Sequence, residues 1–243
     1  MIPTDVLITL FIFPLIMCRY RTVRCCTDIK FSRTSPMTYD RFNNRMPHWL
    51  SEQFFRPAEL DHYARISREL LVTPTPQMLE FCDGAQEIVS RYNTDKTLWR
   101  LFRQKVTERH PDLPAWQQDV CINGHKISSM VELAVYRRLL LEAPATLNLR
   151  IQPFIRELDY KGQADFSLFC KGHPTLYIEV AGTVTSQGKS VSKAAENFRP
   201  GIEERLFRYV GVAPVEMIHV DEVCHVRVQT ERVRHIIARA RSV

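Results

Sequence analysis

Residues 176–182 read Leu-Tyr-Ile-Glu-Val-Ala-Gly, an apolar run with a single carboxylate at its centre. A run of this length, rich in aromatic and branched side chains and ended by glycine, predicts a buried β-strand. Burying an ionised carboxylate is costly unless a partner offsets its charge. Glu179 therefore needs a compensating group, which is a metal ion, a cationic side chain or water at the edge of the sheet.

The segments around this run predict a mixed sheet with flanking helices. Helical patterns precede and follow the run, and a basic helix ends the chain; these segments are residues 128–143, 190–209 and 230–241. Other expected strands cover residues 147–155, 163–170, 215–220 and 223–228. Helices and strands that alternate in this way indicate an α/β or α+β domain.

The chain before residue 115 has helical patterns. Helices are expected over 58–71, with Pro57 in the first turn, and over 77–92, with Thr75 as the cap. Gly84 weakens the middle of the second helix. A third helix over 96–109, opened by Thr94 or Asp95, precedes a break at His110-Pro111. These patterns predict a region built from helices alone.

A proline-bounded linker at residues 111–114 places a boundary near residue 115. Residues 37–115 then form the helical region, and residues 116–243 form the sheet domain. Each part has the length of a small domain.

Residues 1–36 are interpreted as a poorly ordered or non-native leader, and a start of translation at Met37 is one explanation for it. The apolar run at 6–17 is shorter than the roughly 20 residues that cross a bilayer, so no membrane partner is expected. Asp5 stands where a signal peptide has a basic start. Organellar targeting through the basic stretch at 19–33 is the alternative.

Composition narrows the class of protein. The 243 residues include 33 Lys and Arg against 27 Asp and Glu, a net charge of +6 that is compatible with a nucleic-acid partner. The seven cysteines contain no Cys-x-x-Cys pair, which argues against a zinc finger and a disulfide framework. Reduced thiols favour an intracellular, cytoplasmic protein. The sequence has no Walker loop, Gly-x-Gly-x-x-Gly, Gly-x-Ser-x-Gly or His-Glu-x-x-His motif.

Three carboxylates are candidates for a functional site: Glu132, Asp165 and Glu179. The short connection after the Asp165 strand predicts an antiparallel hairpin with the Glu179 strand. A three- or five-residue loop places the two carboxylates opposite each other on one face. A four-residue loop places them on opposite faces unless a bulge intervenes. Because opposed carboxylates repel, a divalent cation between them explains the pairing, and oxygen ligands suit Mg²⁺ or Mn²⁺.

The order of these motifs resembles the PD-(D/E)XK nuclease superfamily, with its restriction-endonuclease-like fold. That pattern has a helix carrying Glu, a strand with Pro-Asp, and a strand with Glu-x-Lys. The matching segments are Ser129-Met130-Val131-Glu132-Leu133, Gly162-Gln163-Ala164-Asp165-Phe166 and Tyr177-Ile178-Glu179-Val180-Ala181-Gly182. The resemblance covers residues 125–222 and rests on order, spacing and strand context together.

The resemblance implies metal-dependent hydrolysis of phosphodiester bonds in DNA, with RNA as the alternative substrate. Asp165 and Glu179 would hold Mg²⁺ or Mn²⁺, helped by the backbone carbonyl of Val180. Glu132 would reach the metal through water or assist with a second ion. A metal in this position lowers the pKa of bound water and offsets charge on the scissile phosphate.

Two positions depart from the family pattern. Ala164 replaces the usual Pro, and Ala181 stands where the family has the Lys that orients or activates the attacking water. Lys189, Lys193 and Gln163 are the candidates to replace that Lys, although the two lysines also fit ordinary surface positions. If none of the three serves, the protein binds nucleic acid without cutting it.

The carboxylates also have structural interpretations. Ser129 and Glu132 have the spacing of a capping box. Asp165 could end a strand and accept backbone N–H groups, and Glu179 could pair with an arginine of the following helix. The arginines considered for that pair are Arg199 and Arg205.

The C-terminal segment is the most basic part of the chain. We interpret Arg232, Arg234 and Arg239 as contacts to a phosphate backbone, and a frayed, solvated helix is the alternative. The sequence as a whole thus predicts a DNA nuclease. The alternatives are a catalytically degenerate nucleic-acid-binding module and a helical interaction protein with purely structural carboxylates.

Overall fold

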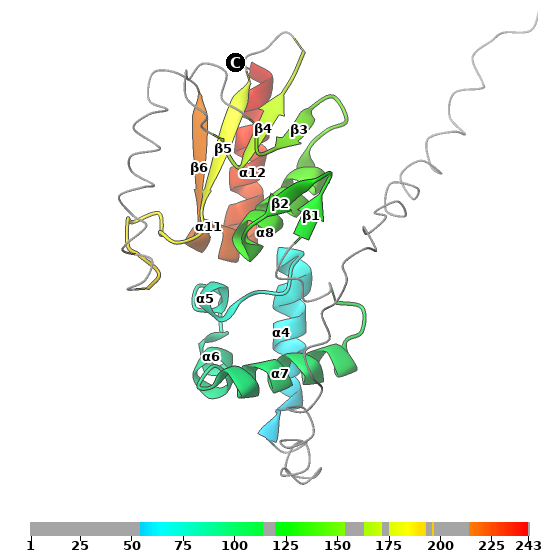
Figure 1. The fold of residues 1–243 in the computed structure, drawn as a ribbon, viewed down its shortest axis with the longest axis vertical. Helices are drawn as coiled ribbons and strands as arrows, with labels where there is room; N and C mark the ends of the chain where they lie inside the picture. The colour runs from blue at the N-terminus through cyan, green and yellow to red at the C-terminus, as the bar shows by residue number, and fades with distance from the viewer. Residues whose placement is uncertain are drawn as a thin grey trace, which may run out of the picture. The chain divides into compact units, whose positions relative to one another are not determined.

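A computed structural model of the chain describes residues 54–113, 120–153, 163–171, 175–192, 196 and 214–242 (Figure 1). The predictions for residues 1–36, and for most of the helix at 190–209, lie outside the described residues. Residues 52–243 form one compact unit.

A mixed sheet of four strands, in the order β3-β4-β5-β6, forms the centre of the described fold (Figure 1). The strands are β3 (Asn148–Ile151), β4 (Phe166–Phe169), β5 (Leu176–Ala181) and β6 (Val215–His219). β3 pairs with β4, and β4 with β5, in antiparallel fashion, whereas β5 and β6 are parallel. All six residues of β5 are buried, which confirms the prediction of a buried strand.

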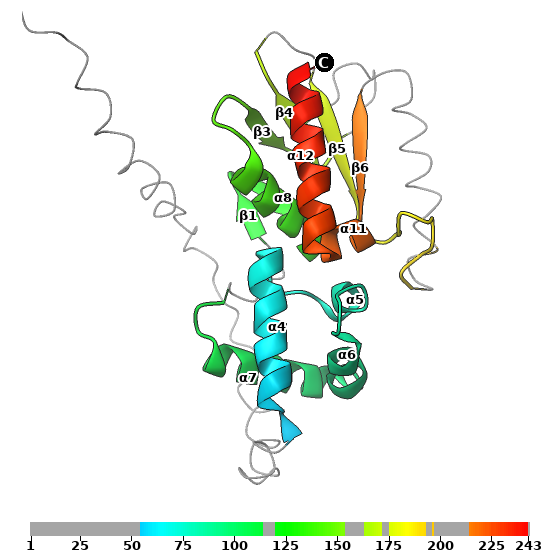
Figure 2. The ribbon, with the colours of Figure 1, turned by 180° about the vertical axis from the view of Figure 1, so that it is seen from behind.

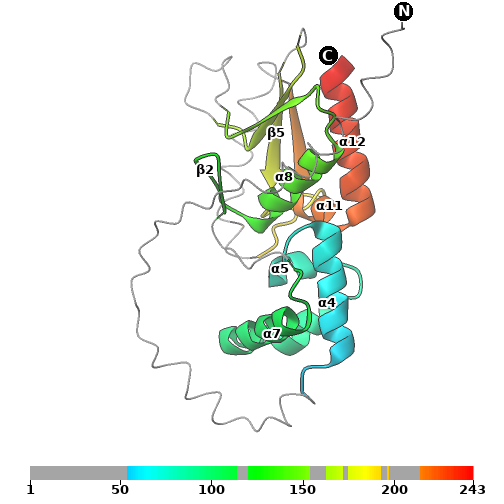
Figure 3. The ribbon, with the colours of Figure 1, turned by 90° about the vertical axis from the view of Figure 1, so that its right-hand side faces the viewer.

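Helices α8 (Met130–Glu142) and α12 (Val226–Ser242) lie against one face of this sheet, as Figures 2 and 3 show. α12 buries side chains at helical spacing, namely Gln229, Val233, Ile236, Ile237 and Ala240. The predicted helix at 128–143 is confirmed. The C-terminal helix is confirmed too, and its buried face rules out the alternative of a frayed, solvated helix.

The strand predicted at 223–228 is wrong. Its residues belong to α11 (Val220–Cys224) and to the start of α12. Val220, Val223 and Cys224 are buried, a spacing that suits one face of a helix. Packing therefore overrides the strand preference of the valines.

A hairpin that was not predicted precedes α8. It consists of β1 (Val120–Ile122) and β2 (His125–Ile127), paired in antiparallel fashion. The connecting residues Asn123 and Gly124 have φ angles of 52° and 82°. Two successive positive φ values are the signature of a tight hairpin turn.

The N-terminal described helices are α4 (Pro57–Leu70), α5 (Pro76–Leu79), α6 (Gln86–Tyr92) and α7 (Lys96–Arg109). Thr75 accepts the Met78 N–H at 3.3 Å and Asp95 accepts the Thr97 N–H at 3.0 Å, so both predicted caps are confirmed. The single helix predicted over 77–92 is wrong. The chain breaks at Gly84, whose φ of +70° is left-handed and incompatible with a continuing helix.

The sheet and these helices share contacts, and the domain boundary near residue 115 stays a prediction. Arg138 of α8 donates to the carbonyl of Glu69 at 2.6 Å and to Oε1 of Gln229 at 3.2 Å. This guanidinium is buried and joins α4, α8 and α12. Within the described part of the chain, none of the helices has the length and apolar composition needed to cross a bilayer.

Candidate active site

The two faces of β5 differ in chemistry because successive side chains of a strand point to opposite sides. The set within the hydrophobic core is Leu176, Ile178 and Val180. The set on the other face is Tyr177, Glu179 and Ala181, each of which is 2% exposed. The carboxylate of Glu179 therefore lies on the sheet face opposite to α8 and α12.

Asp165 lies directly before β4, next to the Glu179 position of β5. The ladder ends at the pair of Phe166 and Ile178, so Asp165 and Glu179 are the residues directly beyond its last pair. This is the register expected for a three- or five-residue loop. Oδ2 of Asp165 also accepts the backbone N–H of Val180 at 2.7 Å, which independently brings its carboxylate to this part of β5.

The hydrogen bond to Val180 confirms the structural interpretation of Asp165 as a strand-end acceptor. Its carboxylate replaces the backbone carbonyl that a continuing β4 would have offered. An ionised carboxylate has about four lone-pair sites, so one N–H contact orients the group without exhausting its acceptor capacity. The structural role and the predicted metal-binding role are thus compatible.

Glu132 closes the N-terminus of α8, as the capping interpretation predicts. The Glu132 N–H donates to Oγ of Ser129 at 3.1 Å, and both hydroxyls of Ser128 and Ser129 donate to Oε1 of Glu132, at 2.7 and 3.0 Å. Oε2 accepts the N–H of Ser128 at 3.1 Å. A Cβ placed on Gly182 would lie 3.8 Å from Oγ of Ser129, so this turn meets the end of β5. Gly182 continues the α8 side of the sheet, whereas Glu179 points to the other side.

The metal set predicted from three carboxylates is not assembled by the described residues. Among them, no group of three or more His, Cys, Asp or Glu side chains could hold a metal ion. The pair of Asp165 and Glu179 still fits Mg²⁺ chemically, since that ion keeps several waters and binds through one or two carboxylates plus substrate phosphate. Glu132 is best described as a helix cap, because its carboxylate already accepts three hydrogen bonds.

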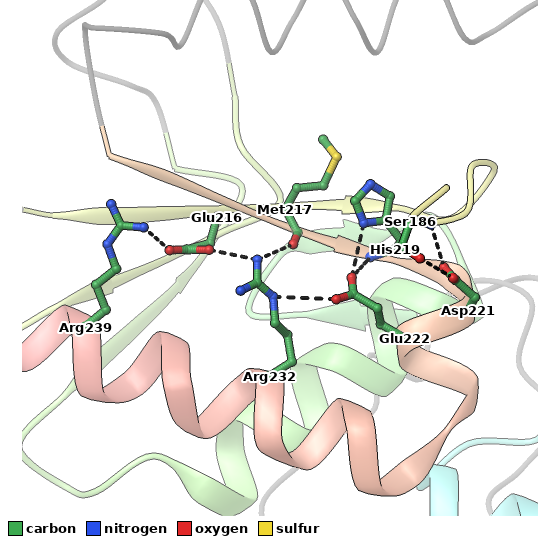
Figure 4. A network of polar contacts seen from close by, with 8 residues as sticks. All are labelled: Ser186, Glu216, Met217, His219, Asp221, Glu222, Arg232 and Arg239. Atoms are coloured by element: carbon green, nitrogen blue, oxygen red, sulfur yellow. Dashed lines mark hydrogen bonds and ion pairs between the residues drawn. The ribbon is translucent and has the colours of Figure 1, made fainter. Parts of the chain in front are cut away.

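The residue beside Ala181 on the neighbouring strand is His219. The parallel ladder pairs Glu179 with Met217 and Ala181 with His219, so these four side chains share one face. Figure 4 shows the side chains of Met217 and His219 on the same side of β6, away from α12. A polar, titratable ring therefore borders the position where the family pattern has Lys.

The imidazole of His219 is held by a carboxylate from α11. Nδ1 of the ring lies 3.1 Å from Oε2 of Glu222, and the same oxygen accepts the His219 backbone N–H at 2.8 Å (Figure 4). Burial disfavours the Glu222 carboxylate, but the two contacts from His219 and the charge of Arg232 outweigh burial and lower its pKa. An ionised Glu222 makes Nδ1 the donor and leaves the ring's lone pair on Nε2.

Arginines of α12 stabilise this carboxylate and a second one on β6. Nη2 of Arg232 donates to Oε2 of Glu216 at 2.9 Å and to the carbonyl of Met217 at 3.0 Å. Nε of Arg232 lies 3.7 Å from Oε1 of Glu222. Arg239 pairs with the other oxygen of Glu216, which is 5% exposed (Figure 4). The network thus alternates cations and anions from Arg239 to Glu222, and Glu222 contacts the ring of His219.

The arginines predicted to contact nucleic acid all have carboxylate partners. Arg232 and Arg239 pair with Glu216, and Arg234 donates to Glu142 at 2.7 Å. Arg232 and Arg239 therefore neutralise a buried charge on the sheet side of α12. Their contact with a phosphate backbone stays a prediction, and these pairs supply a structural reason for the residues.

Of the other candidates for the missing Lys, Lys189 and Gln163 belong to the described residues. Lys189 is exposed in a turn whose backbone bonds to Thr185, and Gln163 is exposed two residues before Asp165. Lys193 lies outside the described residues. Sequence reasoning missed His219. The acidic pair Asp221-Glu222, which begins two residues after it, is a signal for the first turn of a helix and could have marked His219 as a helix start.

Comparison with models of known protein families, with curated proteins and with solved structures found no match.

Proposed function

We propose that this protein is a metal-dependent nuclease that hydrolyses phosphodiester bonds in DNA, with a PD-(D/E)XK-like site. The observation that carries the proposal is the end of the β4–β5 ladder, where Asp165 directly precedes β4 and the buried Glu179 directly follows the last residue of β5 that pairs with β4. In a ladder that continued by one residue, the Cβ atoms of the two would be about 4.5–5.5 Å apart. Two carboxylates at that spacing repel each other unless a cation is shared between them.

The arrangement of the elements supports the same proposal. A helix with Glu132 in its first turn, a strand that follows Asp165, and a strand with Glu179 occur in the order of the family pattern. β6 then lies parallel to the Glu179 strand. The net charge of +6 favours a polyanionic substrate.

The residues of the site would bind the metal ion in the proposed reaction. Asp165 and Glu179 would hold Mg²⁺ or Mn²⁺, together with the carbonyl of Val180. When bound, the ion would lower the pKa of a water molecule and offset the charge of the phosphate. The N–H of Val180 fixes the orientation of Asp165, and the burial of β5 holds Glu179 in place.

A nuclease fold that binds DNA without cutting it is the second candidate. Its supporting observation is Ala181, whose methyl group cannot transfer a proton or hold a water molecule. The two candidates differ in one property, which is turnover in the presence of metal.

The test is cleavage of supercoiled plasmid and of labelled single- and double-stranded oligonucleotides, including RNA, with Mg²⁺, Mn²⁺ or chelator. We expect metal-dependent cleavage that falls at least about 100-fold in Asp165→Asn and Glu179→Gln, since even indirect partners of metal ligands change activity by about 10–100-fold. Asp165→Asn keeps an oxygen that can accept the Val180 N–H, so its loss would not reflect a broken strand end. The matched control is Glu87→Gln, the same change on the exposed surface of α6.

Three results would contradict the enzyme. They are no cleavage under any condition, cleavage that survives chelation, and cleavage equal in wild type and Glu179→Gln. Salt-dependent DNA binding without cleavage would instead support the binding module.

A further inference from the structure

The strand pairing fills the position beside Ala181 with an ordered side chain. Ala181 and His219 are Cα partners in the β5–β6 ladder, and Glu179 is one side-chain repeat before Ala181 on the same face. A group on His219 can therefore act next to a phosphate that is bound at Glu179. The side chain of His219 is 23% exposed, so solvent reaches it.

The ring of His219 has one defined orientation. Within the described residues, Nδ1 of the ring lies 3.1 Å from the Glu222 carboxylate, and because an ionised carboxylate only accepts, we assign Nδ1 as the donor. A histidine backed by a carboxylate presents Nε2 as a base in a fixed direction. The charged groups around the ring are Glu222 and Asp221 of α11 and Arg232 of α12.

The carboxylates beside the ring are themselves fixed. Glu222 is held by Arg232, and Asp221 accepts the N–H and the hydroxyl of Ser186 at 2.8 and 2.6 Å. Ser186 belongs to the segment that follows β5. The ring itself is held by Glu222, while the contact of Asp221 with Ser186 ties α11 to the segment after β5 (Figure 4).

We propose that His219 is the general base of the nuclease and takes the place of the Lys that Ala181 replaces. This inference rests on the proposed function. A lone pair of the attacking water forms a bond to phosphorus, and the proton of that water moves to Nε2. The bond from phosphorus to the leaving oxygen breaks with its electron pair on that oxygen, which takes a proton from solvent. The products are a phosphate monoester and an alcohol, and His219 later returns its proton to solvent.

His219 makes more contacts than the start of α11 needs. The backbone N–H of His219 already bonds to Glu222, which satisfies the start of α11. That bond exists for any residue at position 219. The His219 side chain also completes a capping box with Glu222 at the start of α11, and its contact with the Glu222 carboxylate fixes the direction of the ring.

The test compares His219→Ala, His219→Asn and Glu222→Gln with wild type in the plasmid assay with Mg²⁺. We expect both His219 variants to lose about 100-fold in rate, within the range of general base catalysis. Asn is a favoured N-cap residue, so His219→Asn keeps the helix start while it removes the base. Free imidazole added to His219→Ala should restore at least tenfold, which a structural role would not produce. His235→Ala, an exposed histidine of α12, is the control and should keep the wild-type rate.

A second readout is independent of turnover. Long-range proton–nitrogen NMR spectra of the wild-type protein should show His219 as the Nδ1–H tautomer, and Glu222→Gln should change this signature. The role of His219 would be overturned if His219→Asn kept full activity. It would also be overturned if imidazole did not raise the rate of folded His219→Ala. Either result would leave the nuclease proposal intact. An inactive wild-type protein would overturn both.

Discussion

Oδ2 of Asp165 accepts the backbone N–H of Val180 at 2.7 Å, and this contact joins the start of β4 to the strand that carries Glu179. It brings the carboxylate of Asp165 to the backbone of the residue that follows the buried Glu179. Asp165 thus has a structural role that any account of its function must include. Variants that keep an acceptor oxygen at position 165 separate that role from metal binding.

The break at Gly84 predicts the effect of a substitution there. Gly84→Ala should destabilise the protein by about 1 kcal/mol, because a φ of +70° is left-handed and costs an L-residue about 1–2 kcal/mol. A Cβ would also come within 3.3 Å of Cε1 of His62. Urea unfolding monitored by circular dichroism measures the change. Gly124→Ala, with φ of +82° and no atoms within 4 Å, is the control for the backbone cost alone.

A continuous helix over 77–92 would give the opposite sign at Gly84. Alanine is more stable than glycine in a helix interior by about 0.5–1 kcal/mol. A stabilising Gly84→Ala variant would therefore contradict the described break.

The buried carboxylate of Glu216 predicts unequal costs for two arginines of α12. Arg232→Ala should destabilise the protein by about 2–4 kcal/mol, since it leaves a buried charge with only one of its two cations. Arg234→Ala should cost less than about 1 kcal/mol, because its pair with Glu142 has an arginine side chain that is 66% exposed. Denaturant unfolding of both variants is the measurement. Equal losses of unfolding free energy in the two variants would contradict the role of Arg232 in neutralising the buried Glu216.

The contacts of Asp61 predict a pH dependence of stability. Hydrogen bonds from Arg109 are the main cause that lowers the pKa of Asp61 to about 2 from 3.8, although burial opposes this and His110 adds a contact at 2.7 Å. A depressed folded-state pKa stabilises the fold above the unfolded value, and this contribution is lost as pH falls through about 2. Because the side chain is 46% exposed, the contribution is at most about 1 kcal/mol.

The measurement is the unfolding free energy of wild type and Asp61→Asn between pH 7 and pH 2. The difference should be constant above pH 5 and shrink towards pH 2. A difference that does not change with pH would show that the charge of Asp61 contributes nothing.

The sheet was predictable because its strands have strong local signals. The run of 176–182 has the length, branched residues and terminal glycine of a strand, and the order of elements around it follows from the pattern of apolar and turn residues along the chain. The register of Asp165 and Glu179 could be reduced to two alternatives by counting loop residues. The loop length itself was the missing quantity.

Three features of the fold were not predicted from the sequence: one had a local signal that was not used, and the other two depend on packing or strand pairing. The hairpin at β1 and β2 carries an Asn-Gly pair, Asn123-Gly124, which is a strong signal for a tight turn and could have been used. The helical state of residues 223–228 depends on burial against the sheet, which the valines do not reveal. The place of His219 beside Ala181 depends on which distant strand pairs with β5, and no local pattern gives that pairing.

The most direct test of the account is a Mn²⁺ titration, followed by electron paramagnetic resonance, of wild type, Asp165→Asn, Glu179→Gln and Glu87→Gln. If Asp165 and Glu179 share one ion, wild type and Glu87→Gln bind one Mn²⁺ with equal affinity, and each of the other two variants loses that binding. Wild-type affinity in either Asp165→Asn or Glu179→Gln, or no binding by wild type, would contradict the shared metal site.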